Sequence, residues 1–156
     1  MIRFKQKLTE DECKDILNSA SHGVLSLVDS DSCAYGVPLN FVFDGEYIFF
    51  HCAKRGFKTD CINNNKNASF CVVAQDNIVP DELTSYFKSV IVRGEIKIET
   101  DEDRKLYALD ILCKKYTGGG MPVSGINSAS ECVKRAEILT LSCSEITGKQ
   151  AKELIK

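Results

Sequence analysis

The segment YGVPLNFVFDGEYIFFHCAKRGFKTDCINNN, residues 35–65, carries the clearest structural pattern in the sequence. Asp44-Gly45 separates two apolar runs and predicts a tight β-hairpin between them. The run before this turn contains Pro38, which cannot donate a hydrogen bond to a ladder, so we expect a sheet edge or a bulge there. The run after it predicts a returning antiparallel strand, and the polar stretch that follows predicts a short helix.

Positive charge gathers where the returning strand gives way to this helix. Lys54, Arg55 and Lys58 lie within five residues, and Gly56 interrupts them. The first amides of a helix have no partners inside the helix and carry partial positive charge. Together with a lysine in the first turn, they predict a site for an anion such as a terminal phosphate. The alternative is a solvated basic turn that binds nothing.

His51 comes directly before this turn and is one of two histidines in the chain. A histidine at the end of a strand most often makes a backbone hydrogen bond. If it faces a ligand, it can donate a hydrogen bond or transfer a proton near neutral pH. A zinc site formed by His51, Cys52 and Cys61 would fit no common ligand spacing, so we expect no metal. His22, the other histidine, is expected to be structural.

Composition limits the classes of function. The 156 residues correspond to one ordinary domain, residues 1–156, and the net charge is −2. This charge argues against a general nucleic-acid or membrane surface. No apolar run approaches the roughly 20 residues of a membrane span. The eight cysteines form no CxxC pair, so we expect free thiols acting as small apolar side chains in a cytoplasmic protein.

The remaining patterns predict antiparallel strands with helices inserted between them. Thr9 and Glu12 form a capping box for a first helix, and the strongest helix is expected over residues 100–116, capped by Thr100. The apolar stripe expected on that helix consists of Leu106, Leu109, Leu112 or Cys113, and Tyr116. The expected strands are residues 24–28, 33–43, 46–52, 68–74, 86–99 and 136–149, and the expected loops are residues 76–85 and 117–130. The predicted fold class is α+β, a six-stranded antiparallel split β-barrel with flanking helices.

The order of these elements resembles one known family. The marks are the strand VPLN at 37–40, the Asp44-Gly45 hairpin, and the pattern H-x-A-x-x-G-x-K at 51–58. Two weaker marks are residues 89–116 and the segment ITGKQA at 146–151. Together they are similar to the nitroimidazole-resistance (Nim-type) branch of the pyridoxamine 5′-phosphate oxidase-like flavoproteins, over nearly the whole chain.

The resemblance implies a split barrel that binds FMN at a homodimer interface. It implies that Lys58, Cys52 and Ala53 hold the phosphate, and that Val37, Pro38, Leu39 and Asn40 lie along the isoalloxazine. Phe50 and His51 would lie beside the ring. Ser89 and Val90 would approach from the strand after the loop, in the same chain or the partner chain.

The implied activity is that of an FMN-dependent oxidoreductase acting on a small nitroaromatic or related compound, with His51 as proton donor. Pyridoxamine phosphate oxidation is not expected, because Phe57 stands beside Lys58 where those oxidases have more arginine, and the chain ends in AKELIK without their Arg-Leu-x-Pro-like segment. The alternatives are a flavin-binding or redox-sensing protein without turnover, and a split barrel that binds haem or deazaflavin.

Overall fold

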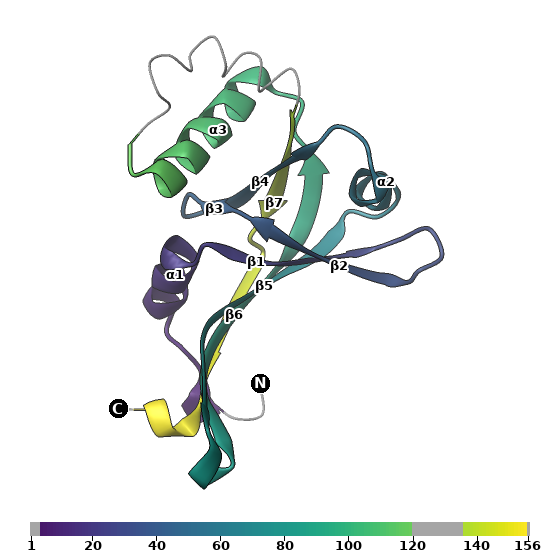
Figure 1. Ribbon diagram of the computed structural model, residues 1–156. Coiled ribbons are helices and arrows are strands. Elements are labelled where there is room, and N and C mark those ends of the chain that lie inside the picture. Colours follow the sequence, from purple (N-terminus) through teal and green to yellow (C-terminus); the bar gives the residue numbers. More distant parts are fainter. Residues whose placement is uncertain (1–3, 120–135, 156) are drawn as a thin grey trace.

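The protein forms one antiparallel β-sheet that curls into a split barrel, with α-helices around it (Figure 1). The computed structural model describes residues 4–119 and 136–155. The helices are α1 (Glu10–Ser19), α2 (Phe57–Asn64) and α3 (Glu102–Thr117), and the short 3-10 turns are η1 (Phe4–Gln6), η2 (Pro80–Glu82) and η4 (Lys152–Leu154). The strands are β1 (His22–Val28), β2 (Ala34–Asn40), β3 (Val42–Phe43), β4 (Tyr47–Ala53), β5 (Asn67–Val79), β6 (Thr84–Ile98), β7 (Ala136–Ser142) and β8 (Glu145–Gln150).

The strand order is β2-β1-β5-β6-β7-β4-β3. Strand β8 is not part of this linear order and pairs with β6. The long strand β6 holds the two halves together. Its first part pairs with β5 and β8, and its last residues, Ile96 to Ile98, pair with β7. Gly94 lies where the pairing changes, and a Cβ atom there would collide with the Ser142 carbonyl group. Only glycine allows the two strands to approach this closely.

The expected fold class is confirmed, although the described residues form eight strands and not six. The strand expected over residues 33–43 breaks at Phe41, and the last strand breaks between β7 and β8. Residues 76–85, expected to form a polar loop, instead extend β5 and β6 into a long hairpin. The hydrogen bonds of a β-ladder join backbone groups, so a solvent-exposed hairpin can form from polar residues. The polar composition of residues 76–85 therefore did not exclude strands.

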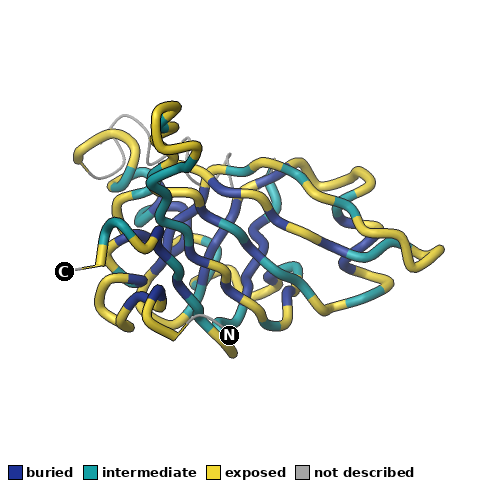
Figure 2. The backbone as a smooth tube through the Cα atoms, turned by 90° about the horizontal axis from the view of Figure 1, so that it is seen from below, coloured by how far each residue is buried: buried dark blue, intermediate teal, exposed yellow. Residues whose placement is uncertain are grey.

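The core has two parts, one on each face of β4. Inside the barrel, Phe70 packs edge-to-face against both Phe41 and Phe50, with ring centroids 4.7 and 5.0 Å apart. On the other face, Phe49 packs beneath α3 with Leu109 and other apolar side chains of that helix. Residues Ile48 to Phe50 of β4 are therefore buried in succession. Figure 2 shows that buried stretches of the backbone gather in the middle of the molecule and that exposed segments lie around them.

Helix α3 begins one residue later than expected, because the side chain of Asp101, not Thr100, accepts the Arg104 amide and caps the helix. Its buried residues include Leu109 and Leu112, as expected. Leu106 and Tyr116 were wrongly assigned to the buried stripe, because each is 41% exposed. Within the described residues, no helix is long and apolar enough to span a membrane.

Candidate functional site

A pocket of about 740 Å³ opens between α3 and the outer face of β4. Its size lies in the range of sites that hold cofactors and other small molecules. Most of its wall is apolar, and its polar groups are few. The lining residues are Asn40, His51, Cys52, Ala53, Leu109, Leu112, Cys113, Tyr116, Thr117 and Ala136.

The side chains at the end of β4 alternate between the inside of the barrel and the pocket. Phe50 is fully buried inside the barrel, whereas His51 and Ala53 are exposed and line the pocket. The His51 ring has no hydrogen-bond partner among the residues that the structure describes, so the expected backbone bond is not found. His51 is therefore available to a ligand, while Phe50 could reach one on this side only through its backbone.

Strand β2 contributes Asn40 to the pocket. Val37 and Leu39 are half-buried and pack against the barrel core, whereas Pro38 and Asn40 are exposed on the opposite face. β2 ends the strand order, so Pro38 lies on an edge strand, as its missing N–H group predicts. Of the four residues predicted along the ring, Asn40 alone lines the pocket.

The basic turn lies between β4 and α2, beyond Cys52. Gly56 occupies the N-cap position with φ 147°, a backbone conformation that favours glycine, and no side chain caps the helix there. Lys54 and Arg55 are exposed, whereas Lys58 is half-buried. Burial raises the pKa of the Cys52 thiol, and the charge of Lys58 opposes that rise. The field of the Lys58 ammonium group therefore reaches a residue of the pocket wall.

Ser89 and Val90 lie away from the pocket in this chain. They are in the middle of β6, where Val90 is fully buried in the barrel and Ser89 faces outward between Val73 and Lys149. A contact between Ser89 and a ligand in this pocket would therefore have to come from another copy of the chain.

The second wall of the pocket comes from α3, none of whose residues was predicted to belong to the site. Leu109, Leu112, Cys113, Tyr116 and Thr117 all belong to this helix. The only signal in the sequence was the apolar stripe, and such a stripe does not distinguish a core contact from a pocket wall.

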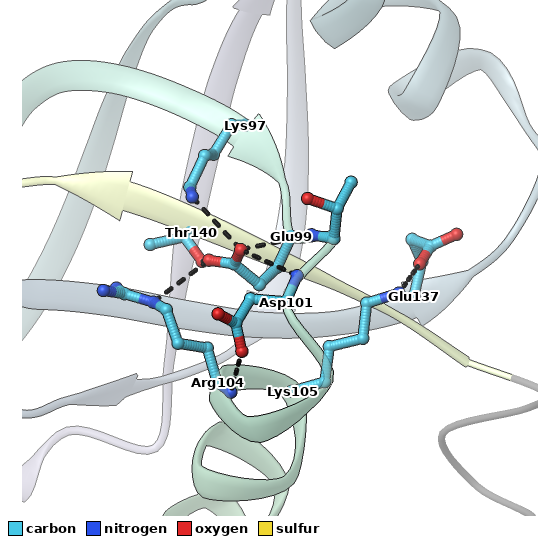
Figure 3. Close-up of polar contacts among 8 residues, drawn as sticks. Lys97, Glu99, Asp101, Arg104, Lys105, Glu137 and Thr140 are labelled. Atoms are coloured by element: carbon cyan, nitrogen blue, oxygen red, sulfur yellow. Dashed lines mark hydrogen bonds and ion pairs between the residues drawn. The ribbon is translucent and has the colours of Figure 1, made fainter.

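A buried carboxylate holds the start of α3 against the sheet (Figure 3). Glu99 is 1% exposed, and its oxygens accept hydrogen bonds from Lys97 and Thr140, both at 3.1 Å. The amides of Thr100 and Asp101 also donate to it, and Arg104 lies 3.2 Å away. Burial alone would raise the pKa of Glu99, but these hydrogen bonds and the charge of Lys97 lower it overall.

The other end of α3 is held by Lys115 and Tyr116. The Lys115 ammonium group lies 3.9 Å from the centre of the Phe41 ring and donates to the Leu17 carbonyl at 3.3 Å. Burial lowers its pKa to about 8. The Tyr116 hydroxyl contacts the backbone of Ser21 and Phe41. Both ends of the helical wall are thus attached to the sheet side of the molecule.

Comparison with known proteins identifies the family. The model of the pyridoxamine 5′-phosphate oxidase family matches residues 9–150, nearly the whole chain. The chain belongs to this family. None of the curated protein sequences compared matches it.

Solved structures share the fold of this pyridoxamine 5′-phosphate oxidase family member. One is a proposed 5-nitroimidazole antibiotic resistance protein from Bacteroides thetaiotaomicron, 20% identical with a TM-score of 0.78, covering 92% of this chain and 85% of that one. An FAD- and haem-binding protein from Mycobacterium smegmatis is 17% identical with a TM-score of 0.76, covering 94% and 73%. An FAD-binding protein from Mesorhizobium loti is 18% identical with a TM-score of 0.68, covering 94% and 97%.

Thiols are frequent in this family member, but they build no metal centre in the described part of the chain. Cys52 and Cys61 are buried, and no group of three or more His, Cys, Asp or Glu side chains there could hold a metal ion. Six cysteines of the described residues are free thiols: Cys13, Cys33, Cys52, Cys61, Cys71 and Cys143. The loop expected over residues 117–130 falls largely outside the described residues.

Proposed function

We propose that this protein binds FMN and uses it to reduce a small nitroaromatic or related compound in the cytoplasm. The observation that carries the proposal is the pocket itself. In it His51, which has no hydrogen-bond partner among the described residues, and the amide of Asn40 lie within an apolar wall, near the start of α2. Such a pocket suits a planar, mostly apolar ring with a few polar atoms. The resemblance to a proposed nitroimidazole resistance protein supports the choice of substrate.

The basic turn suits the phosphate of such a cofactor. The N-terminus of α2 offers backbone N–H groups that no side chain caps, and the half-buried Lys58 adds a full positive charge. No side chain blocks the approach at Gly56, where even an added Cβ atom would meet nothing within 4 Å. Lys58 is therefore the proposed anchor, with Cys52 and Ala53 at the adjoining end of the pocket.

Bound FMN would supply the electron transfer. The protein's own groups orient the ligand, exclude water and provide protons. Leu109 and Leu112 form a dry wall, and Asn40 can hydrogen-bond a polar edge of the ring. Reduction of a nitro group to a nitroso group takes up two electrons and two protons and releases water. His51, exposed in the pocket, is the proposed donor of one of these protons.

We further propose that two copies pair through the outer face of β2, β1, β5 and β6. Pro38, Val24, Cys71 and Ile91 lie opposite one another in register across these strands, and all point outward. Val24 and Ile91 are each 41% exposed, and Val73 on the same face is 61% exposed. A row of apolar side chains of this kind on a sheet is typical of a surface that a partner covers.

This face runs up to the pocket. Asn40 lies two residues beyond Pro38 on the same side of β2, and Ser89 lies beside Val73. A symmetric partner seated on the face would therefore reach the open side of the pocket and bring its own Ser89 toward it. The proposed partner is a second copy of this chain, and each site is expected to use residues of both copies.

The phosphate anchor predicts that the protein binds FMN more tightly than riboflavin. Charge-assisted hydrogen bonds contribute about 1.5–3 kcal/mol, so we expect FMN to bind about 10- to 150-fold more tightly in fluorescence titrations. Lys58→Ala should remove most of this preference. Lys54→Ala and Arg55→Ala are the controls and should do less, because both side chains are exposed. Equal affinities for FMN and riboflavin in the wild type would exclude the phosphate site.

The absorbance spectrum of the purified protein separates the proposed cofactor from haem or deazaflavin. A haem-binding member of the fold exists, and His51 is the one histidine that lines the described pocket, so haem is the second candidate. NAD(P)H oxidation that depends on an added nitroaromatic compound separates an enzyme from a flavin store or redox sensor.

The proposed partner surface predicts that Val73→Lys dissociates the dimer and weakens FMN binding. The charge would be placed on the same outer face, two residues along β5 from Cys71, where a partner would have to desolvate it. Light scattering should show the mass of two chains for the wild type and of one chain for the variant. Leu106→Lys, a matched change on the exposed side of α3, should leave the dimer intact. A wild-type monomer that binds FMN at full affinity would contradict the two-chain site.

A further inference from the structure

The chain leaves its ladder for one residue between β2 and β3. Asn40 pairs with His22 at the end of β2, and Val42 pairs with Phe49 at the start of β3. Phe41 lies between them, with its ring fully buried in the barrel. Buried backbone N–H and C=O groups need partners, and at Phe41 neither neighbouring strand supplies them.

The hydroxyl group of Tyr116 takes the place of a strand partner. It accepts the Phe41 amide at 2.8 Å and lies 2.8 Å from the Phe41 carbonyl oxygen and 2.6 Å from the Ser21 carbonyl oxygen. A hydroxyl group has one proton and two lone pairs, so it donates to one of these carbonyl groups at a time. One side chain of α3 thus holds the corner at which β2 ends.

The same corner holds the side chain of Asn40. Its Nδ2 donates to the Ser21 carbonyl oxygen at 3.0 Å, so Asn40 and Tyr116 share one acceptor. This hydrogen bond assigns the orientation of the amide, with its nitrogen toward the backbone. No described residue donates to Oδ1, and both side chains line the pocket. The polar atom that Asn40 leaves for a ligand is therefore an acceptor.

We propose that Tyr116 is a positioning residue, which holds the Ser21–Phe41 corner so that Asn40 presents its Oδ1 acceptor to the ligand. The identity of the ligand as a flavin rests on the proposed function, whereas the arrangement of Asn40 does not. A ring with an N–H group, as an isoalloxazine has, would match this acceptor. A ligand edge that carries only acceptors would not.

The first test needs no cofactor. In NMR spectra of the protein without flavin, Tyr116→Phe should shift the side-chain amide signals of Asn40, because the Ser21 carbonyl group loses its second donor. Tyr107→Phe is the matched control. It removes a hydroxyl group from the same helix that has no hydrogen bond to any described residue, and it should leave the Asn40 signals unchanged. Unchanged Asn40 signals in Tyr116→Phe would overturn the proposal.

The second test is a double-mutant cycle on FMN affinity. We expect Tyr116→Phe to weaken FMN binding about three- to tenfold in the wild-type background. In the Asn40→Ala background it should cost less than twofold, because Tyr116 acts through Asn40. Equal losses in the two backgrounds would show that Tyr116 acts on stability alone and would overturn the proposal.

A second variant covers the case in which Tyr116→Phe does not fold. Asn40→Asp keeps the size of the side chain but removes its N–H group, so it loses the bond to Ser21 and should also weaken FMN binding. Wild-type affinity in Asn40→Asp would contradict the proposed arrangement. If the wild type binds no FMN at all, the proposed function fails, and the NMR comparison alone decides whether Tyr116 holds Asn40.

Discussion

His51→Ala should lower the rate of nitroaromatic reduction by about 10²- to 10⁴-fold, because a general acid usually contributes a factor of this size. The variant should still bind FMN. The imidazole lines the pocket, is exposed, and has no hydrogen bond to any described residue, so its removal should disturb neither the barrel nor the phosphate site. The measurement is NAD(P)H oxidation with saturating nitroaromatic compound, together with a separate FMN titration.

Two further variants make this result specific. His51→Gln keeps a hydrogen-bonding side chain that cannot carry the proton, so it should bind FMN as the wild type does and should not restore the rate. His22→Ala should leave the rate unchanged, because His22 bonds only to Ser21 among the described side chains and lies outside the pocket lining. A wild-type rate in His51→Ala would return His51 to a purely structural role.

Glu99→Gln should lower the free energy of unfolding by about 2–3 kcal/mol, because the carboxylate is the common partner of Lys97, Thr140, Arg104 and two backbone amides. The loss should stay below the ~3–5 kcal/mol of a fully buried pair, since Lys97 and Arg104 remain partly hydrated. The start of α3 should loosen, and FMN affinity should fall with it, because this helix forms one wall of the pocket.

The stability that Glu99 contributes should depend on pH. The pKa of Glu99 lies below its ordinary value of 4.5 in the folded protein, so the carboxylate contributes its stability fully above pH 4.5. The contribution disappears as the pH falls through the lowered pKa. Denaturant unfolding should therefore show the full difference between wild type and Glu99→Gln at pH 7, and a shrinking difference below about pH 4.5.

An exposed ion pair provides the control for Glu99. Arg93 and Glu145 lie 3.5 Å apart, and both side chains are more than half exposed. Exposed pairs contribute about 0–1 kcal/mol, so Glu145→Gln should change the stability little at any pH. If Glu99→Gln behaves like Glu145→Gln, the buried cluster does not hold α3 in place.

Features that depend on neighbours in the chain were predictable from the sequence. Asp44-Gly45 predicted the hairpin, and the capping box of Thr9 and Glu12 is present in the structure. The alternation along β4 separates Phe50 from His51, and the start of α2 carries Lys58 where the basic turn was expected. Local turn chemistry and side-chain alternation act over a few residues, so a short segment contains all the information they need.

Tertiary structure alone decided how the pocket is closed. The apolar stripe of α3 showed that some surface must cover this helix, but not that Tyr116 would reach the break at Phe41, 75 residues away. Where the sheet curls decides three further features. These are the break at Phe41, the division of the last strand into β7 and β8, and the change of partners at Gly94. Such contacts join residues far apart in the chain, and hydrophobic burial, which drives them, favours no particular partner. The sequence by itself therefore determined the alternating strand β4 and the basic turn after it, whereas packing decided which helix forms the opposite wall of the pocket and how Asn40 is held.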